Sequence, residues 1–263
     1  MIPNFGMGTF RLSGSSLTEL VEQALEIGYQ HIDTAQAYEN EADVGKALSR
    51  SADRKIFITT KVWHEKLAYQ DVLDSLRESC DRLQRDTLDL ALIHWPSPNQ
   101  EVPLQETLDA LTEARERGLI RNFGLSNFTI KLMKQALQHV GAENILTNQI
   151  EVHPFMQNSK VTKACADLGV KVTAYLPLAK GAVVENKTLQ RIAEEHNASP
   201  AQVAIAWELR KGFISIPSTT KESHLKDNFE AQKLKLSEED MAEIKELDEN
   251  DRIIDPSFAP DWD

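Results

Sequence analysis

The chain has 263 residues, of which 41% are apolar and 27% are charged, and its formal net charge is −12. This composition supplies enough apolar surface for a full-sized core and excludes disordered and fibrous proteins. The negative charge argues against nucleic acid or an anionic membrane as a partner, because binding to phosphate groups depends on clustered lysine and arginine.

Short β-branched or apolar runs alternate along the chain with longer segments whose apolar residues repeat at helical spacing. We expect strands at residues 4–8, 30–34, 55–61, 88–94, 121–125, 146–152, 171–175 and 213–217. Apolar stripes between them predict crossover helices around residues 17–25, 72–83, 104–114 and 132–140. Ser199-Pro200 and Ser237 are typical of the first residues of two further helices.

This alternation predicts an α/β protein with a parallel sheet covered by helices. Eight strand–helix units without a linker between them favour a single (β/α)₈ TIM barrel domain, residues 1–263, with a flap-like C-terminal tail at about 252–263. The rival architecture is an open doubly wound sheet, which usually carries a GxGxxG nucleotide-binding turn. Here Gly6-Met7-Gly8 is followed by Arg11 at the third glycine position, so that fingerprint is absent.

Features of the chain as a whole favour a cytoplasmic protein. No apolar run approaches the roughly 18 residues of a membrane span, and the first residues lack the charged and apolar regions of a signal peptide. Cys80 and Cys165 are too few for a disulfide framework, so we expect both to be reduced and buried.

Polar residues collect at the carboxyl ends of the predicted strands. In a barrel these ends share one rim, where barrel enzymes build their active sites. One polar residue at a strand end is unremarkable, but a series on successive strands favours a functional site. The residues concerned are Asp33, Lys61, His94, Ser126, Gln149, Tyr175 and Ser218.

Asp33, Tyr38, Lys61 and His94 provide a carboxylate, a phenol, an ammonium and an imidazole for this rim. A tyrosine is a poor acid or base at neutral pH because its unperturbed pKa is about 10. An ammonium about 4 Å away, at an effective dielectric constant of about 20, is worth roughly 4 kcal/mol and would lower that pKa by about three units. Lys61 fits this role, Asp33 would keep the lysine protonated, and His94 would orient a carbonyl oxygen or share the proton.

Seven segments together resemble the aldo-keto reductase family, and the short bacterial members in particular. Their order and spacing match over nearly the whole chain, which makes seven individually weak motifs specific. They are Gly-Met-Gly-Thr at 6–9, Asp-Thr-Ala-Gln-Ala-Tyr-Glu-Asn-Glu at 33–41, Thr-Lys-Val-Trp at 60–63, Leu-Ile-His-Trp-Pro at 92–96, Gly-Leu-Ser-Asn-Phe at 124–128, Asn-Gln-Ile-Glu at 148–151 and Ala-Tyr-Leu-Pro-Leu at 174–178.

The resemblance implies a barrel that binds NADPH in extended form and reduces aldehydes or ketones. It implies a catalytic tetrad of Asp33, Tyr38, Lys61 and His94, with Tyr38 giving the proton as hydride passes to the carbonyl carbon. It also implies that Tyr175 stacks on the nicotinamide while Ser126, Asn127 and Gln149 bind its carboxamide. The other residues expected at the cofactor are Thr9, Leu176, Leu178, Ile216, Ser218, Thr219, Thr220, Lys221, His224 and Asn228.

The segment after the last predicted strand departs from the family pattern. Many members have Ile-Pro-Lys-Ser there and an arginine a few residues later, whereas this chain has Ile-Pro-Ser-Thr-Thr-Lys at 216–221 and His224 at the arginine position. Lys221 can supply one positive charge, and the hydroxyl groups can donate hydrogen bonds. We therefore expect a preference for NADPH, with weaker discrimination against NADH than a bidentate arginine gives.

Large aromatic residues near the strand ends are expected to wall the substrate pocket: Phe10, Trp63 and Trp95, with Trp262 of the tail placed over it. The loops after residues 95 and 178 are short, which predicts an open mouth suited to small or sugar-derived carbonyl compounds. The family resemblance suggests a monomer with a small-molecule substrate as its partner.

Two other functions remain open. His31, Asp33, His94, Glu151 and His153 could form the ligand set of a metal-dependent hydrolase, although no HExxH or close histidine pair supports this and we expect no metal. Alternatively, the barrel could bind NADPH without catalysis, as a redox-sensing module.

Overall fold

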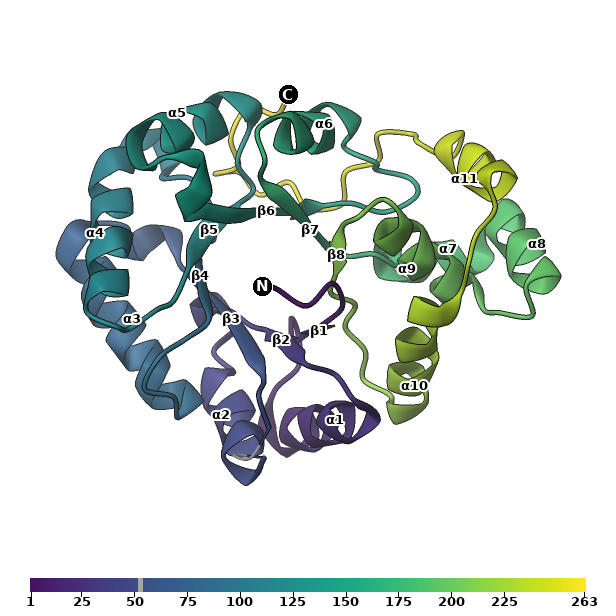
Figure 1. Ribbon diagram of the computed structural model, residues 1–263, viewed down its shortest axis with the longest axis horizontal. Coiled ribbons are helices and arrows are strands. Elements are labelled where there is room, and N and C mark those ends of the chain that lie inside the picture. The colour runs from purple at the N-terminus through teal and green to yellow at the C-terminus, as the bar shows by residue number, and fades with distance from the viewer. Residues whose placement is uncertain (52–53) are drawn as a thin grey trace.

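The computed structural model describes residues 1–51 and 54–263. Its sheet has eight strands that pair in parallel and in sequence order, with helices around the outside (Figure 1). The strands are β1 (Met7–Gly8), β2 (His31–Asp33), β3 (Phe57–Val62), β4 (Leu90–Ile93), β5 (Phe123–Ser126), β6 (Ile145–Glu151), β7 (Lys171–Tyr175) and β8 (Ile214–Ser215). A parallel bridge between Phe5 and Ser215 joins the chain before β1 to β8. The sheet therefore closes on itself, which confirms the predicted (β/α)₈ barrel.

Helices follow each strand; those before β8 cross to the start of the next strand, and the last two come after β8. They are α1 (Gly14–Ile27), α2 (Glu41–Arg50), α3 (Tyr69–Leu83), α4 (Leu104–Glu116), α5 (Ile130–Val140), α6 (Ser159–Asp167), α7 (Ala182–Glu185), α8 (Lys187–Glu195), α9 (Pro200–Arg210), α10 (Glu222–Glu230) and α11 (Glu238–Lys245). Ser199 and Ser237 cap α9 and α11 through capping boxes, as predicted. Within the described residues, no helix combines the length and the apolar character needed to cross a membrane.

The seam of the barrel depends on a glycine. The Gly8 amide donates a 3.0 Å hydrogen bond to the Pro217 carbonyl, and a Cβ on Gly8 would lie 2.8 Å from the Ile216 carbonyl oxygen. A larger residue would push the two segments apart, so the sequence places glycine where the first and last strands must approach closely.

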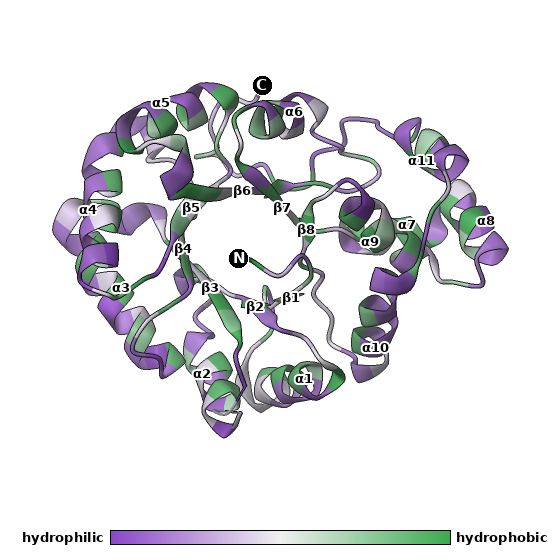
Figure 2. Ribbon diagram, in the orientation of Figure 1, coloured by the Kyte–Doolittle hydropathy of each residue, from purple (hydrophilic) through white to green (hydrophobic). Residues whose placement is uncertain are grey.

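Apolar residues fill two layers of the structure. The helices turn their apolar faces inward to the strands and their polar faces outward (Figure 2). Inside the barrel lies a smaller buried cluster that includes Ile2, Leu90, Leu92, Ile214 and Ile216. Side chains thus fill the barrel interior, as expected for a barrel of this size. A site can therefore form only at the end of the barrel where the carboxyl ends of the strands lie.

Both cysteines lie in the core between helices and strands. Cys80 of α3 is 6% exposed and Cys165 of α6 is fully buried, and both are free thiols. Burial raises the pKa of each thiol to about 11. The prediction of reduced, buried cysteines agrees with these positions.

One buried carboxyl group in the outer layer is not paired. Glu208 of α9 is completely buried, and neither carboxylate oxygen has a hydrogen-bond partner among the described residues. Burial raises the pKa of Glu208 well above its usual value. The protonated acid is therefore the form that this packing favours.

Candidate active site

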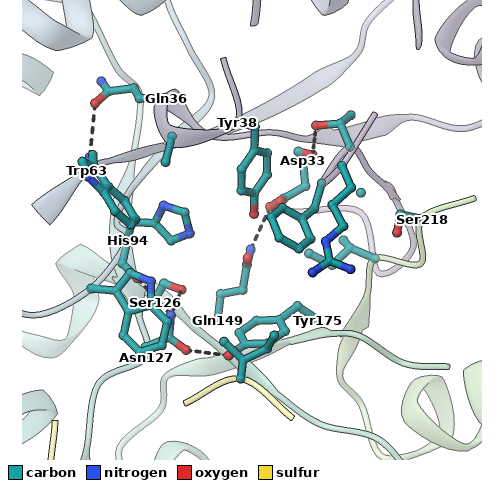
Figure 3. A pocket seen from close by; sticks show the side chains of 18 of the residues that line it. Asp33, Gln36, Tyr38, Trp63, His94, Ser126, Asn127, Gln149, Tyr175 and Ser218 are labelled. Carbon is teal, nitrogen blue, oxygen red and sulfur yellow. Dashed lines mark hydrogen bonds between the residues drawn. The ribbon is translucent and has the colours of Figure 1, made fainter. Parts of the chain in front are cut away.

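The carboxyl ends of the strands surround a cavity of about 840 Å³ (Figure 3). Asp33 ends β2, Tyr38 follows in the 3₁₀ turn Gln36–Tyr38, and His94 comes directly after β4. These three side chains line the cavity together with Ser126, Asn127, Gln149 and Tyr175 from the next strand ends. The barrel thus brings residues from distant parts of the chain to one wall.

Lys61 lies behind this wall and does not line the cavity. It is 1% exposed, and its ammonium donates to Asp33 Oδ1 at 2.5 Å, to the Thr34 carbonyl at 2.8 Å and to Tyr38 Oη at 3.3 Å. All three ammonium protons therefore have partners. These hydrogen bonds hold the Lys61 ammonium in one position. Because Lys61 does not line the cavity, it can affect a substrate only through Tyr38.

The charges behind Tyr38 have opposing effects on its pKa. Burial raises the pKa of Tyr38 above its ordinary value, the positive charge of Lys61 lowers it, and Asp33 raises it again. Lys61 thus lowers the pKa, as expected, but desolvation of the phenolate outweighs the ammonium, so the net pKa is raised and not lowered. The phenol is accordingly protonated at neutral pH.

The partners of Lys61 keep it charged, as predicted. Burial acts to lower the pKa of Lys61, but Asp33 and then Tyr38 outweigh that effect, and the net pKa lies above the ordinary value. His94 behaves in the opposite way, because burial, Lys61 and His64 all lower its pKa, well below 6.5. At neutral pH the site therefore holds an ammonium behind Tyr38 and a neutral imidazole beside it.

Two amide side chains organise the floor of the cavity (Figure 3). Gln149 donates from Nε2 to Asp33 Oδ2 at 2.7 Å, and its Oε1 has no partner within the described residues. Asn127 donates to the His94 carbonyl at 3.0 Å and to Ser126 Oγ at 3.2 Å, and it accepts from Tyr175 Oη at 2.8 Å. Gln149 thus retains an oxygen that can bind a ligand, whereas Asn127 mainly holds its neighbours in place.

Two residues that hold the turn carrying Tyr38, Asn40 and Gln36, were not predicted from the sequence as part of the site. Asn40 is completely buried, accepts from Thr34 Oγ1 at 2.7 Å and donates to the carbonyls of Thr9 and Leu12, both at 2.9 Å. Gln36 accepts from the Trp63 amide at 3.2 Å. Asn40 lies inside the motif at 33–41, but only the fold reveals its backbone partners.

The residues expected at the cofactor fall into two groups. One group lines the cavity: Thr9, Ser126, Asn127, Gln149, Tyr175, Leu176, Ile216 and Ser218. The other lies outside its lining: Leu178, Thr219, Thr220, Lys221, His224 and Asn228. Lys221 and His224 are exposed at the start of α10, where Thr219 Oγ1 accepts from the Lys221 amide at 3.1 Å. Asn228 of this second group is buried and Leu178 is half-buried, so only the segment 219–224 forms an open rim, in contrast to the buried cluster at Tyr38.

Four cations line the cavity: Arg11, Lys66, Arg82 and Lys180. Arg11 and Lys180 are exposed, and both have positive φ angles, 63° and 53°. Neither was predicted from the sequence as a site residue. Carboxylates line the cavity as well, among them Glu39 and Asp255, so its charge is mixed.

Phe10, Trp63 and Trp95 line the cavity, as expected for its aromatic wall. Trp262 is not among the lining residues but packs edge-on against Trp95, with ring centroids 6.0 Å apart, so its place over the pocket stays a prediction. Its indole donates to Asp255 at 2.9 Å, and the guanidinium of Arg252 lies 3.7 Å from its ring centroid, so the tail folds back on this side chain. The tail residues at the cavity are instead Ile253, Ile254, Asp255 and Pro256.

The proposed metal ligands do not converge. Across residues 1–51 and 54–263, no group of three histidine, cysteine, aspartate or glutamate side chains is arranged to hold a metal ion. Glu151 and His153 bind each other at 3.1 Å, while Asp33 binds Lys61 and Gln149. The metal-dependent hydrolase is therefore not supported.

Comparison with known proteins agrees with this site. Residues 4–249 match the aldo/keto reductase family. Methylglyoxal reductase DkgB from Escherichia coli O157:H7 is 49% identical over 265 residues, which cover 100% of this chain and 99% of that protein.

Solved structures agree as well. A crystal structure provisionally described as a 2,5-diketo-D-gluconic acid reductase B has a TM-score of 0.96 at 38% identity, with 100% of this chain and 94% of that chain covered. The aldo-keto reductase of Bombyx mori in complex with NADP has a TM-score of 0.91 at 30% identity, with 99% and 94% covered. The chain therefore belongs to the aldo/keto reductase family and is an oxidoreductase that reduces carbonyl groups with a nicotinamide cofactor.

Proposed function

We propose that this enzyme reduces small or sugar-derived aldehydes and ketones, uses NADPH in preference to NADH, and employs Tyr38 as its proton donor. The observation that carries the proposal is the Tyr38 hydroxyl on the cavity wall, with the Lys61 ammonium 3.3 Å behind it. The phenol holds its proton at neutral pH, and the Lys61 ammonium, which acts to lower the pKa of Tyr38 against the effect of burial, favours transfer of that proton to a substrate oxygen.

The four residues of the tetrad then have distinct tasks. The cofactor, when bound, supplies the hydride to the carbonyl carbon. Tyr38 donates its proton to the carbonyl oxygen, and Lys61 stabilises the negative charge left on the tyrosine. Asp33 keeps Lys61 protonated and in place, and neutral His94 orients the carbonyl oxygen with a hydrogen bond. Proton uptake from water restores the phenol.

The cavity suits a nicotinamide nucleotide. The Ser126 hydroxyl and the Gln149 Oε1 atom can pair with a carboxamide, and the ring of Tyr175 offers a flat face for stacking. Arg11 and Lys180 on the cavity wall, with Lys221 on the rim, can offset the phosphate charge. We assign the preference for NADPH mainly to Lys221, with help from Thr219, Thr220 and His224.

Methylglyoxal and 2,5-diketo-D-gluconate are the substrates we propose to test first. The relatives named above carry these two compounds in their names, and both compounds place a second oxygen beside the reacting carbonyl. The cavity is open and combines aromatic side chains with polar ones such as Gln36, which suits short, oxygen-rich molecules better than large apolar ones.

We further propose that the chain acts in the cytoplasm as a monomer and as one barrel domain whose tail is a flap. Two free, buried cysteines fit a reducing compartment. The alternative, a redox-sensing barrel that binds NADPH without turnover, is disfavoured because the hydrogen bonds among Asp33, Lys61 and Tyr38 are all formed.

The test is an NADPH-consumption screen of the purified protein over methylglyoxal, 2,5-diketo-D-gluconate, nitrobenzaldehydes and aldoses, repeated with NADH. We expect turnover of the dicarbonyl compounds with the highest kcat/KM and a higher efficiency with NADPH. NADPH fluorescence quenching without turnover of any carbonyl compound would instead support the sensing module.

A further inference from the structure

Glu151 makes an unusual set of contacts at the end of β6. It is completely buried and does not line the cavity. Its Oε1 accepts the amide of Ile253 at 2.7 Å, and its Oε2 accepts the amide of Ile254 at 2.8 Å. One carboxylate therefore holds two successive backbone amides of a tail that is more than 100 residues later in the chain.

The surroundings of Glu151 keep its charge in place. Burial acts to raise the pKa of Glu151, but hydrogen bonds from His153, Ile253 and Ile254 outweigh it and lower the net pKa. His153, itself fully buried, contacts Oε1 at 3.1 Å, and Asn158 Nδ2 donates to the Glu151 carbonyl at 3.2 Å. A buried carboxylate is costly unless every such bond is made, so the tail amides are part of what makes this charge tolerable.

The point of attachment lies beside the cofactor and substrate region. Glu151 pairs with Tyr175 across β6 and β7, and Ile253, Ile254, Asp255 and Pro256 share the cavity lining with Tyr175. The tail passes close to Tyr175 in Figure 3. Further along, Phe258 packs edge-on against Trp63 and Trp95, with ring centroids 5.8 and 5.5 Å apart.

We propose that Glu151 is a positioning residue for the substrate side of the cavity: it fixes the tail backbone at residues 253–254 and so sets how closely residues 253–256 approach a bound carbonyl compound. The kinetic part of this inference rests on the proposed function, whereas the attachment of the tail does not. Glu151 has no contact with the Tyr38 hydroxyl or with Lys61, so its loss should affect substrate binding more than the chemical step.

The main variant is Glu151→Gln, which keeps the shape of the side chain. It replaces one carboxylate oxygen with an NH₂ group, which cannot accept the hydrogen bond of a tail amide. Loss of a charge-assisted hydrogen bond predicts a rise of about tenfold in KM for the carbonyl substrate. We expect kcat to stay within about threefold because the tetrad is unchanged. The NADPH dissociation constant should stay within about twofold because the side chains assigned to the nicotinamide are unchanged. Trypsin cleavage after Arg252 should accelerate about tenfold, since the scissile bond contains the Ile253 amide that Glu151 holds.

Glu249→Gln is the matched control. It makes the same change of charge near the start of the tail, but its side chain is exposed and only its backbone is held, by the Phe155 carbonyl at 3.0 Å. We expect neither its kinetics nor its trypsin cleavage to differ from those of the unmodified enzyme.

A second pair of variants changes the tail rather than the buried acid. Ile254→Pro removes the amide that donates to Oε2, whereas Ile254→Ala keeps the amide and only shortens the side chain. The proline variant should show the larger rise in KM and the faster cleavage after Arg252. If Glu151→Gln does not fold, the comparison of Ile254→Pro with Ile254→Ala still tests whether the attachment of the tail to Glu151 affects substrate binding.

Equal behaviour of the proline and alanine variants, together with unchanged KM and cleavage in Glu151→Gln, would overturn the inference. It would also be overturned if Glu151→Gln lowered kcat and NADPH affinity as much as it raised KM, because that indicates general damage. If the unmodified enzyme turned over no carbonyl compound, the proposed function would fail while the cleavage assay still tested the attachment of the tail.

Discussion

The buried cluster behind Tyr38 and the exposed rim formed by residues 218–224 are both expected to handle charge, yet they are built in opposite ways. Lys61 and Asp33 are 1% and 2% exposed and have their charges matched by hydrogen bonds. Lys221 and His224 lie in solvent with few contacts. Burial strengthens each electrostatic interaction but demands a full set of partners, whereas exposed charges act weakly and are screened by salt.

The largest effect is expected at the centre of the buried cluster. Tyr38→Phe removes the proton donor, and kcat for carbonyl reduction should fall about 10³-fold, the range typical of a general acid. NADPH binding, followed by fluorescence quenching, should change by no more than about twofold, since the phenol acts on the substrate. Turnover within tenfold of the unmodified enzyme would contradict the role given to Tyr38.

Lys61→Met tests whether the cluster acts as a unit. Removal of the ammonium leaves Asp33 buried without its main partner, which should cost about 3–5 kcal/mol of stability in denaturant unfolding. Turnover should fall about 10²-fold because the charge formed on Tyr38 loses its stabilisation. The double variant Asp33→Asn with Lys61→Met should be more stable than Lys61→Met alone. Additive losses in the double variant would show that the two charges are independent.

Glu208 shows what burial does to a charge that has no partner. Its pKa is raised in the folded state, so the folded protein binds more protons than the unfolded chain above about pH 4.3, and stability falls as pH rises from there through the folded pKa. Within that window the loss should approach about 1.4 kcal/mol per pH unit. Glu208→Gln should unfold with a flatter pH dependence, and parallel pH profiles for the two proteins would refute the assignment.

The smallest effect is expected on the rim. Lys221→Ala should raise KM for NADPH about fivefold, or about 1 kcal/mol, and leave KM for NADH nearly unchanged, because an exposed cation contributes little. Lys226→Ala is a control on the same helix, since Lys226 pairs with Glu222 at 2.9 Å on the surface. An unchanged ratio of the two catalytic efficiencies in Lys221→Ala would remove Lys221 from cofactor recognition.

The sequence predicted well what depends on local pattern. Strand periodicity located every strand of the barrel, and residues 171–175 have the same bounds in both descriptions. The first predicted strand, 4–8, shortens to Met7–Gly8 because Phe5 pairs only through a single bridge. Asp33, Tyr38 and His94 could be grouped in advance because the ends of parallel strands share one rim.

The sequence predicted poorly what depends on the balance of burial and partners. The pKa of Tyr38 was expected to be lowered because Lys61 is visible in the motif, but the packing that buries the phenol is not. Trp262 is expected over the pocket because the tail is aromatic, but its contacts with Arg252, Asp255 and Trp95 depend on how the tail folds back. The hydrogen bond from the Ile253 amide to Glu151 likewise joins residues that are far apart in the sequence, and no local sequence pattern predicts their contact.

The burial of the two cysteines determines whether their thiols can react with the carbonyl compounds that the enzyme reduces. Carbonyl electrophiles and oxidants react with thiolates, which are the nucleophilic form of cysteine, rather than with thiols. Cys80 and Cys165 are buried, and the pKa of each is raised to about 11, so both stay protonated and out of reach at physiological pH. Neither cysteine therefore offers a sulfur nucleophile to the carbonyl compounds that the enzyme reduces.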